Sequence, residues 1–310
     1  MPGKHAGNTR IPRAGDATAP GTPRLDLLED LGGQGPVLHL AHANGFPPGA
    51  YRLFAQALAA HYRVVALPAR PLWPGSMPEE APTWRTMAGD MLRGLEALDA
   101  PGMVGLGHSM GGVFTLWAAI DRPDLYRAVV LIDPVILPPH WLWWLRLARA
   151  AGLDGRMPLV QATLRRRRTW PGQQACFDHY RRKDLFARWP DDALWDYVRA
   201  AVHEEGEAVT LRYRPEWEAH IFATVPVDIW PDVPRLSVPC LVVRGEHSKT
   251  FVPGAEARVA RLLPAARVVT IPGATHLLPM ERPRETATAV LDFLTAGEFG
   301  GTIGVRGGNR

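Results

Sequence analysis

Cysteine is scarce in this chain of 310 residues, which contains only Cys176 and Cys240. Two cysteines so far apart match neither a disulfide framework nor a set of zinc ligands, and they suit a reducing compartment. Long apolar runs are also missing, so no stretch offers the roughly 20 apolar residues of a membrane-crossing helix. Residues 1–24 hold no apolar segment of the kind that an export signal needs. We therefore expect a cytoplasmic protein without stable membrane insertion, preceded by a flexible N-terminal tail.

Positive charge is concentrated at the two ends of the chain. Residues 1–24 carry a net charge of +3 and residues 299–310 carry +2, which leaves −1 of the total of +4 for the sequence between them. The densest basic cluster, at 165–168, is followed by several aspartates and fits a solvated helix face. A nucleic-acid-binding domain carries its positive charge on the folded body. We expect no nucleic-acid partner and a second flexible tail at 299–310.

Short apolar, β-branched segments alternate with helix-length segments along most of the chain. This alternation predicts an α/β fold with a doubly wound, mostly parallel sheet whose crossovers are helices. The expected strands are residues 37–41, 63–67, 103–106, 128–132, 240–244 and 267–271. The expected helices are residues 49–60, 83–98, 110–121, 255–263 and 283–295.

The alternation stops between about 135 and 234, where the sequence is rich in tryptophan and charge and shows no convincing strand. A long helical insertion between two strands of one sheet is typical of a cap or lid over a binding site. We therefore expect a core formed by residues 25–134 and 235–298, with residues 135–234 as a helical cap.

Eight of the eleven tryptophans lie in this insertion. Large aromatic side chains can pack a small cap onto the body, and they can also line an apolar substrate pocket. We expect Trp141 and Trp144 to contact the substrate. The surrounding segment, 139–150, also fits an amphipathic helix at a membrane surface.

The strongest motif is Gly107-His108-Ser109-Met110-Gly111, which fits G-x-S-x-G. It follows an expected strand and precedes an expected helix, as the motif requires. A serine that attacks a substrate must project from a sharp turn, and the flanking glycines give the backbone room for that turn. Ser109 is therefore the candidate nucleophile.

With this motif the chain resembles the α/β-hydrolase superfamily. In that superfamily the nucleophile lies on a sharp turn between a strand and a helix, the nucleophile elbow, and GHSMGG is a form of this elbow common among esterases, lipases and cofactor-free haloperoxidases. The resemblance extends from about Pro36 to Thr295, and the expected cap is its least specific part. It implies a serine hydrolase that needs no metal and no organic cofactor.

The resemblance also implies an oxyanion hole. One donor is the backbone N–H after the nucleophile, here Met110, and the other comes from the loop after an early strand. That loop is HANGFP at 42–47, which is similar to the family's H-G-F-P turn. In this register Asn44 replaces the usual histidine and joins the substrate-binding residues, and Phe46 offers the second N–H. Fixed backbone amides stabilise a developing alkoxide without reorganising.

A serine hydroxyl needs a base to remove its proton, and in this fold the base lies downstream of the serine and of the acid. His276 lies in PGATHLLPMERP, between the last expected strand and the last expected helix. The family places its catalytic histidine there, and no other histidine of this chain has that position. We expect His276 to be the general base.

The third member, an acid, has two candidates. Many relatives carry it at the end of G-x-x-D, but this chain reads Gly245-Glu246-His247-Ser248 and places serine where the aspartate is expected. Other members of the superfamily draw the acid from the strand after the nucleophile, which here ends in Asp133. We expect Asp133 to orient His276, with Glu246 as the alternative.

These residues predict hydrolysis of a carboxylic ester or a related, largely apolar small acyl substrate through an acyl-enzyme on Ser109. Cofactor-free haloperoxidase or perhydrolase activity, carbon–carbon bond hydrolysis and acyl transfer use similar machinery in the same fold. A non-catalytic ligand-binding protein is the alternative from another class, and the missing aspartate at position 248 is its only support. Nothing in the sequence indicates an oligomeric state.

Overall fold

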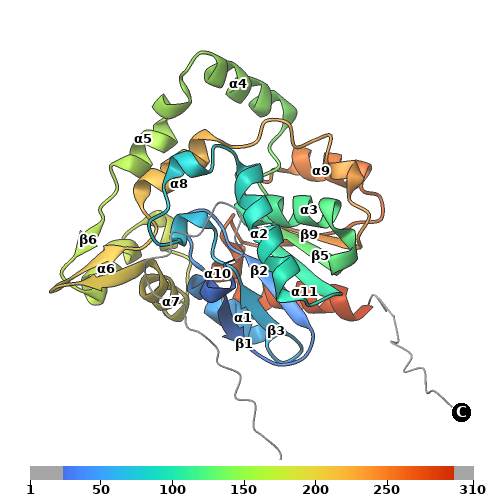
Figure 1. Ribbon diagram of the computed structural model, residues 1–310, viewed down its shortest axis with the longest axis horizontal. Helices are drawn as coiled ribbons and strands as arrows, with labels where there is room; N and C mark the ends of the chain where they lie inside the picture. The colour runs from blue at the N-terminus through green and yellow to red at the C-terminus, as the bar shows by residue number, and fades with distance from the viewer. Residues whose placement is uncertain (1–23, 297–310) are drawn as a thin grey trace, which may run out of the picture.

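The computed structural model describes residues 24–296, which are built around a seven-stranded sheet (Figure 1). Its strands are β1 (Glu29–Gly32), β2 (Val37–Ala41), β3 (Arg63–Ala66), β4 (Met103–His108), β5 (Tyr126–Ile132), β9 (Cys240–Gly245) and β10 (Arg267–Ile271). Their order is β1-β3-β2-β4-β5-β9-β10, and every neighbouring pair is parallel except β1 with β3. The predicted α/β fold is confirmed. Strand β1 was not predicted, because this edge strand has the sequence EDLG with a single apolar residue.

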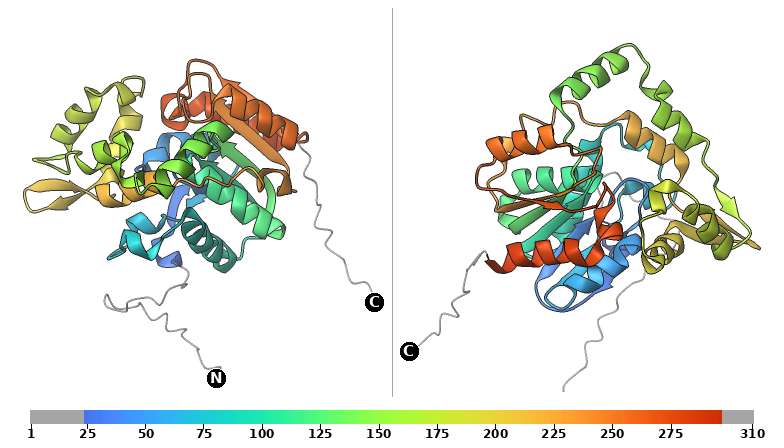
Figure 2. Two further views of the ribbon diagram at one scale, coloured as in Figure 1. Left: turned by 90° about the horizontal axis from the view of Figure 1, so that it is seen from above. Right: turned by 180° about the vertical axis from the view of Figure 1, so that it is seen from behind.

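Both faces of the sheet are covered by helices. On one face lie α1 (Arg52–Leu58) and α11 (Pro283–Ala296), which pack side by side (Figure 2). On the other lie α2 (Trp84–Leu98), α3 (Met110–Asp121) and α9 (Pro253–Leu262). Side chains of β5 alternate between the two layers, as the period of two in a strand requires. Val130 packs on the α1 side and Leu131 on the α3 side, and both are fully buried.

The parallel order brings three loops to one edge of the sheet. Strands β4 and β5 are neighbours, and β5 in turn pairs with β9, with Ile132 beside Val243. Parallel strands end at the same edge of a sheet, so the loops that follow these three strands begin close to one another. Residues 109, 133 and 246 are the first positions beyond these strands.

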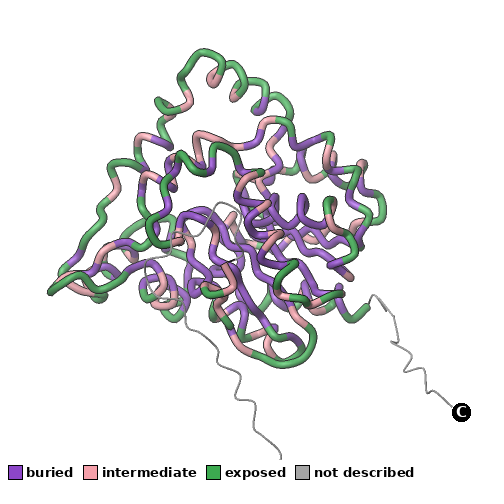
Figure 3. The backbone as a smooth tube through the Cα atoms, in the orientation of Figure 1, coloured by how far each residue is buried: buried purple, intermediate pink, exposed green. Residues whose placement is uncertain are grey.

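The inserted region, residues 135–234, joins β5 to β9. It contains α4 (Pro139–Ala150), α5 (Pro158–Leu164), α6 (Gln173–Arg181), α7 (Asp191–Ala201) and α8 (Pro215–Ala223). Figure 1 shows it extending from α4 at the top to α7, which packs against α1. Figure 3 shows the sheet buried and α4 largely exposed.

The inserted region is mainly helical, as expected, but it also contains strands that the sequence pattern did not indicate. The inserted region also holds an antiparallel sheet of β6 (Thr169–Trp170), β8 (Ala208–Leu211) and β7 (Val202–Glu205). Most of β7 is exposed and its sequence, VHEE, has no apolar alternation, so the usual strand pattern is missing. The turn between β7 and β8 is made by Gly206, whose φ of 62° favours glycine.

The two predicted tails lie outside the described residues, apart from Arg24. The Arg24 guanidinium lies over the ring of Trp73 and pairs with Asp26. Within residues 24–296, no helix is long and apolar enough to cross a membrane.

Candidate active site

Ser109 occupies the turn between β4 and α3 with a φ of 58° and a ψ of −116°. A positive φ is rare outside glycine and is found where the surrounding structure enforces it. Space around this turn is so tight that a Cβ on Gly107 would overlap the Gly111 carbonyl, and one on Gly111 would overlap the Ala41 carbonyl. Both glycines of the motif are therefore sterically required, and the turn presents Ser109 at the carboxyl edge of the sheet.

His276 lies in the loop between β10 and the short helix α10 (Leu278–Glu281). Its Nε2 is 2.9 Å from Ser109 Oγ, the distance of a good hydrogen bond. The Ser109 residue is 6% exposed, whereas a quarter of the His276 side chain faces solvent. A base in contact with the serine thus borders a surface that substrate and water can reach.

Asp133 follows the last residue of β5, with a φ of 41°. It is completely buried, and its Oδ1 lies 2.7 Å from His276 Nδ1. A carboxylate only accepts hydrogen bonds, so this contact places a proton on Nδ1 and leaves Nε2 free to accept one from Ser109. The structure thus brings Ser109, His276 and Asp133 together in one chain of contacts.

Glu246, the alternative acid, does not take part in this chain. Its side chain is half exposed, and its Oε2 accepts a hydrogen bond of 2.7 Å from the Gly273 amide. Its Oε2 also lies 3.8 Å from Nε2 of His247. The structure therefore leaves Glu246 away from His276.

Sequence reasoning named Ser248 only as the residue that replaces an expected aspartate. In the structure it is buried and its Oγ lies 2.6 Å from Asp133 Oδ1. The other carboxylate oxygen of Asp133 accepts a bond of 3.0 Å from the Gly245 amide. Asp133 is therefore held by the loop that carries the acid in many relatives.

The two backbone amides expected to stabilise an oxyanion differ in whether they already donate a hydrogen bond. Met110 is the first residue of α3, so no helical carbonyl precedes it to receive its amide proton. The Phe46 amide instead donates to Ala43 O across a turn, at 3.2 Å. Phe46 can serve an oxyanion only by sharing or releasing this long bond.

Asn44 connects the oxyanion loop to the inserted region. Its Nδ2 donates to Glu218 O of α8 at 3.1 Å, and its buried Oδ1 has no partner among the described residues. The Glu218 carboxylate packs against Gly45 and forms a partly buried ion pair with Arg166. Burial raises the pKa of Glu218, and the Arg166 charge opposes that rise. Asn44 is thus tethered to α8, and its contact with a substrate stays a prediction.

A second, buried network was missed by sequence reasoning, which assigned His108 only to the elbow turn. His108 Nε2 is 2.8 Å from His276 O, and its Nδ1 is 2.8 Å from the Tyr51 hydroxyl. The His276 carbonyl can only accept, so His108 donates from Nε2 and accepts from Tyr51 at Nδ1. Tyr51 in turn accepts the Ala43 amide at 2.9 Å. These bonds tie the oxyanion loop to the backbone of His276.

The two tryptophans predicted to bind substrate lie on α4. Trp141 is 39% exposed and Trp144 is 62% exposed. Neither is part of a packed core, so the structure does not support the view that they only hold the inserted region onto the body. Contact between these side chains and a substrate remains a prediction.

Comparison with known proteins identifies the family. A model of the alpha/beta hydrolase family matches residues 38–289, and the chain belongs to that family. It is 25% identical over 279 residues to a 2-(acetamidomethylene)succinate hydrolase of Mesorhizobium japonicum, covering 88% of this chain and 93% of that protein.

Solved structures agree on the fold. The crystal structure of an E-2-(acetamidomethylene)succinate hydrolase superposes with a TM-score of 0.72 at 22% identity, covering 86% of this chain and 94% of that one. A thermophilic esterase from Thermogutta terrifontis superposes with a TM-score of 0.62 at 23% identity, covering 87% and 92%. These two structures show the shared fold, and the family model alone shows membership of the alpha/beta hydrolase family.

Proposed function

We propose that the protein hydrolyses carboxylic esters or related acyl substrates through an acyl-enzyme on Ser109. The observation that carries this proposal is the contact chain from Ser109 Oγ through both ring nitrogens of His276 to Asp133. The Ser109 proton passes to Nε2 as Oγ attacks the acyl carbon, and Asp133 stabilises the imidazolium that forms. The negative oxygen of the tetrahedral intermediate accepts from the amide of Met110, and from that of Phe46 once this amide shares or releases its bond to Ala43 O.

The remaining steps use the same groups. The imidazolium returns its proton to the leaving oxygen, the alcohol departs, and Ser109 carries the acyl group. Water then gives a proton to His276 as its oxygen attacks the ester carbon, and collapse of the second intermediate releases the acid and restores Ser109. Burial raises the pKa of both cysteine thiols to about 12, which argues against a thiolate nucleophile.

We further propose that the inserted region acts as a cap and favours an apolar acyl group. Support comes from the exposed Trp141 and Trp144 and from the link between Asn44 and α8. The two buried, unpaired cysteines suit a cytoplasmic location.

The test is turnover of p-nitrophenyl esters from acetate to decanoate, with a rapid-mixing experiment to detect a burst of p-nitrophenolate. We expect a burst equal to the enzyme concentration wherever deacylation is slower than acylation. Ser109→Ala should lower kcat by roughly 10³-fold or more. Ser237→Ala, at an exposed serine, is the matched control and should retain full activity. Equal turnover by Ser109→Ala would end the proposal.

A further inference from the structure

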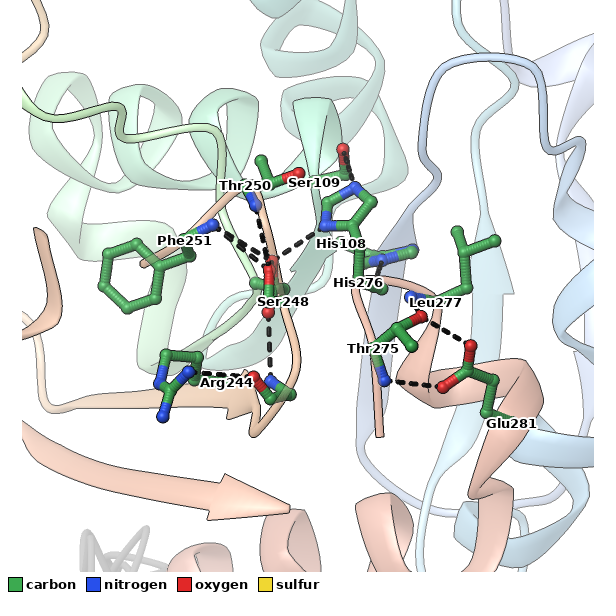
Figure 4. A network of polar contacts seen from close by, with 12 residues as sticks. His108, Ser109, Arg244, Ser248, Thr250, Phe251, Thr275, His276, Leu277 and Glu281 are labelled. Atoms are coloured by element: carbon green, nitrogen blue, oxygen red, sulfur yellow. Dashed lines mark hydrogen bonds and ion pairs between the residues drawn. The ribbon is translucent and has the colours of Figure 1, made fainter. Parts of the chain in front are cut away.

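Ser248 lies in the loop between β9 and α9 and is in hydrogen-bond contact with the Asp133 carboxylate. Its Oγ is 2.6 Å from Asp133 Oδ1, and the residue is only 7% exposed. Two backbone amides also point at this oxygen, those of Thr250 at 3.1 Å and Phe251 at 3.2 Å (Figure 4). The hydroxyl is therefore surrounded by three polar partners inside the protein.

The direction of each hydrogen bond follows from its chemistry. An amide N–H only donates, so Thr250 and Phe251 occupy the two lone pairs of the Ser248 oxygen. The single hydroxyl proton then has one remaining partner, the Asp133 carboxylate, which only accepts. Ser248 is thereby fixed as a donor to Asp133, and its own amide, bonded to Gly245 O at 3.0 Å, holds it in the loop.

The same Asp133 oxygen receives His276 Nδ1. Oδ1 thus lies between the Ser248 hydroxyl at 2.6 Å and the imidazole at 2.7 Å, while Oδ2 is held by the Gly245 amide. Phe251 N makes a longer contact of 3.4 Å with Oδ1. Without the hydroxyl, Oδ1 would keep only the long Phe251 contact besides the imidazole, and more of its negative charge would act on His276.

We propose that Ser248 is a positioning residue that aims Asp133 at His276 and disperses part of its charge. This inference rests on the proposed function. It adds Ser248 as a residue that acts through Asp133 and does not itself react with the substrate. The competing explanation is structural: Ser248 accepts the amides of Thr250 and Phe251 and so shapes the entry into α9. The two explanations differ in whether the hydroxyl proton matters to catalysis.

The test compares Ser248→Thr, which keeps the hydroxyl, with Ser248→Val, which has the same shape without it. We expect Ser248→Thr to remain within about 3-fold of the parent in kcat. Ser248→Val should lose roughly 10- to 100-fold, the range for a hydrogen bond to a charged group, with KM within about 2-fold. Ser248→Ala is measured alongside, because it cannot fail through added bulk.

A pH–rate profile separates the two explanations. In Ser248→Val and Ser248→Ala the Asp133 carboxylate lacks the hydroxyl and would stabilise the protonated ring of His276 more strongly. The acidic limb of the profile of kcat/KM against pH should therefore shift to higher pH in both variants. A purely structural role would lower the melting temperature and leave that limb in place.

Three outcomes would overturn the inference. The first is equal loss in Ser248→Thr and Ser248→Val with an unmoved acidic limb, and the second is full activity in both Ser248→Val and Ser248→Ala. In either case Ser109→Ala must remain inactive, which leaves the proposed function standing. The third is retained activity in Ser109→Ala, which removes the proposed function and this inference with it.

Discussion

Three buried histidines should make the fold sensitive to mild acid. His39, His42 and His108 are each at most 1% exposed. Each has a ring nitrogen that accepts a hydrogen bond, from the Leu67 amide, the Ala69 amide and the Tyr51 hydroxyl respectively. Burial lowers the pKa of His39 to about 3 and of His42 to about 4, and it lowers that of His108 well below the usual value. All three are therefore neutral in the folded protein.

The size of the effect follows from linkage. A histidine whose pKa is depressed by folding costs stability as the pH falls below its unfolded pKa of about 6.5, because only the unfolded chain takes up the proton. At pH 5.5 this costs about 1.4 kcal/mol for each residue, or about 4 kcal/mol for three, against almost nothing at pH 7.5. The melting temperature should fall by on the order of 10 °C. Burial raises the pKa of Glu29 and Glu218, whose protonation acts in the opposite direction.

The assay is urea unfolding at pH 7.5 and 5.5, with His39→Asn as the control. An asparagine oxygen can accept the Leu67 amide but takes up no proton, so this variant should lose about a third of the pH-dependent drop, whatever its stability at pH 7.5. Equal stability of the parent at both pH values would refute the reasoning. An unchanged drop in His39→Asn would refute the role of that residue.

Other predictions concern the acid, the inserted region and the substrate. Asp133→Asn should lower kcat by roughly 10²- to 10⁴-fold with the fold intact, and Glu246→Gln should be nearly silent; steady-state kinetics with the reverse ranking would transfer the role. Arg166→Met leaves the partly buried Glu218 carboxylate unpaired, at a cost of at most about 3–5 kcal/mol, the value for a fully buried pair. This deficit should shrink as the pH falls, because burial raises the pKa of the Glu218 carboxyl and so favours its neutral form. Equal deficits at pH 8 and pH 5 in urea unfolding would contradict the prediction. Trp144→Ala should lower kcat/KM for decanoate more than for acetate with little change in melting temperature, and an unchanged chain-length preference would argue against substrate contact.

The parts that sequence reasoning predicted are those with a local signal. Buried strands such as β5 read as continuous apolar runs, and Ser109 lies in a motif whose glycines are required by the turn itself. The contact between Ser248 and Asp133 joins residues 115 apart. It exists because β5 and β9 are neighbours in the sheet, and no local sequence pattern predicts that pairing.

Labelling with a fluorophosphonate probe, read by intact mass and peptide mapping, tests the central claim most directly. We expect one adduct per chain on the peptide that contains Ser109, none in Ser109→Ala, and much slower labelling in His276→Ala, because the probe reacts only with a serine whose proton a base removes. A parent protein that takes up no probe, or an adduct that persists in Ser109→Ala, would contradict it.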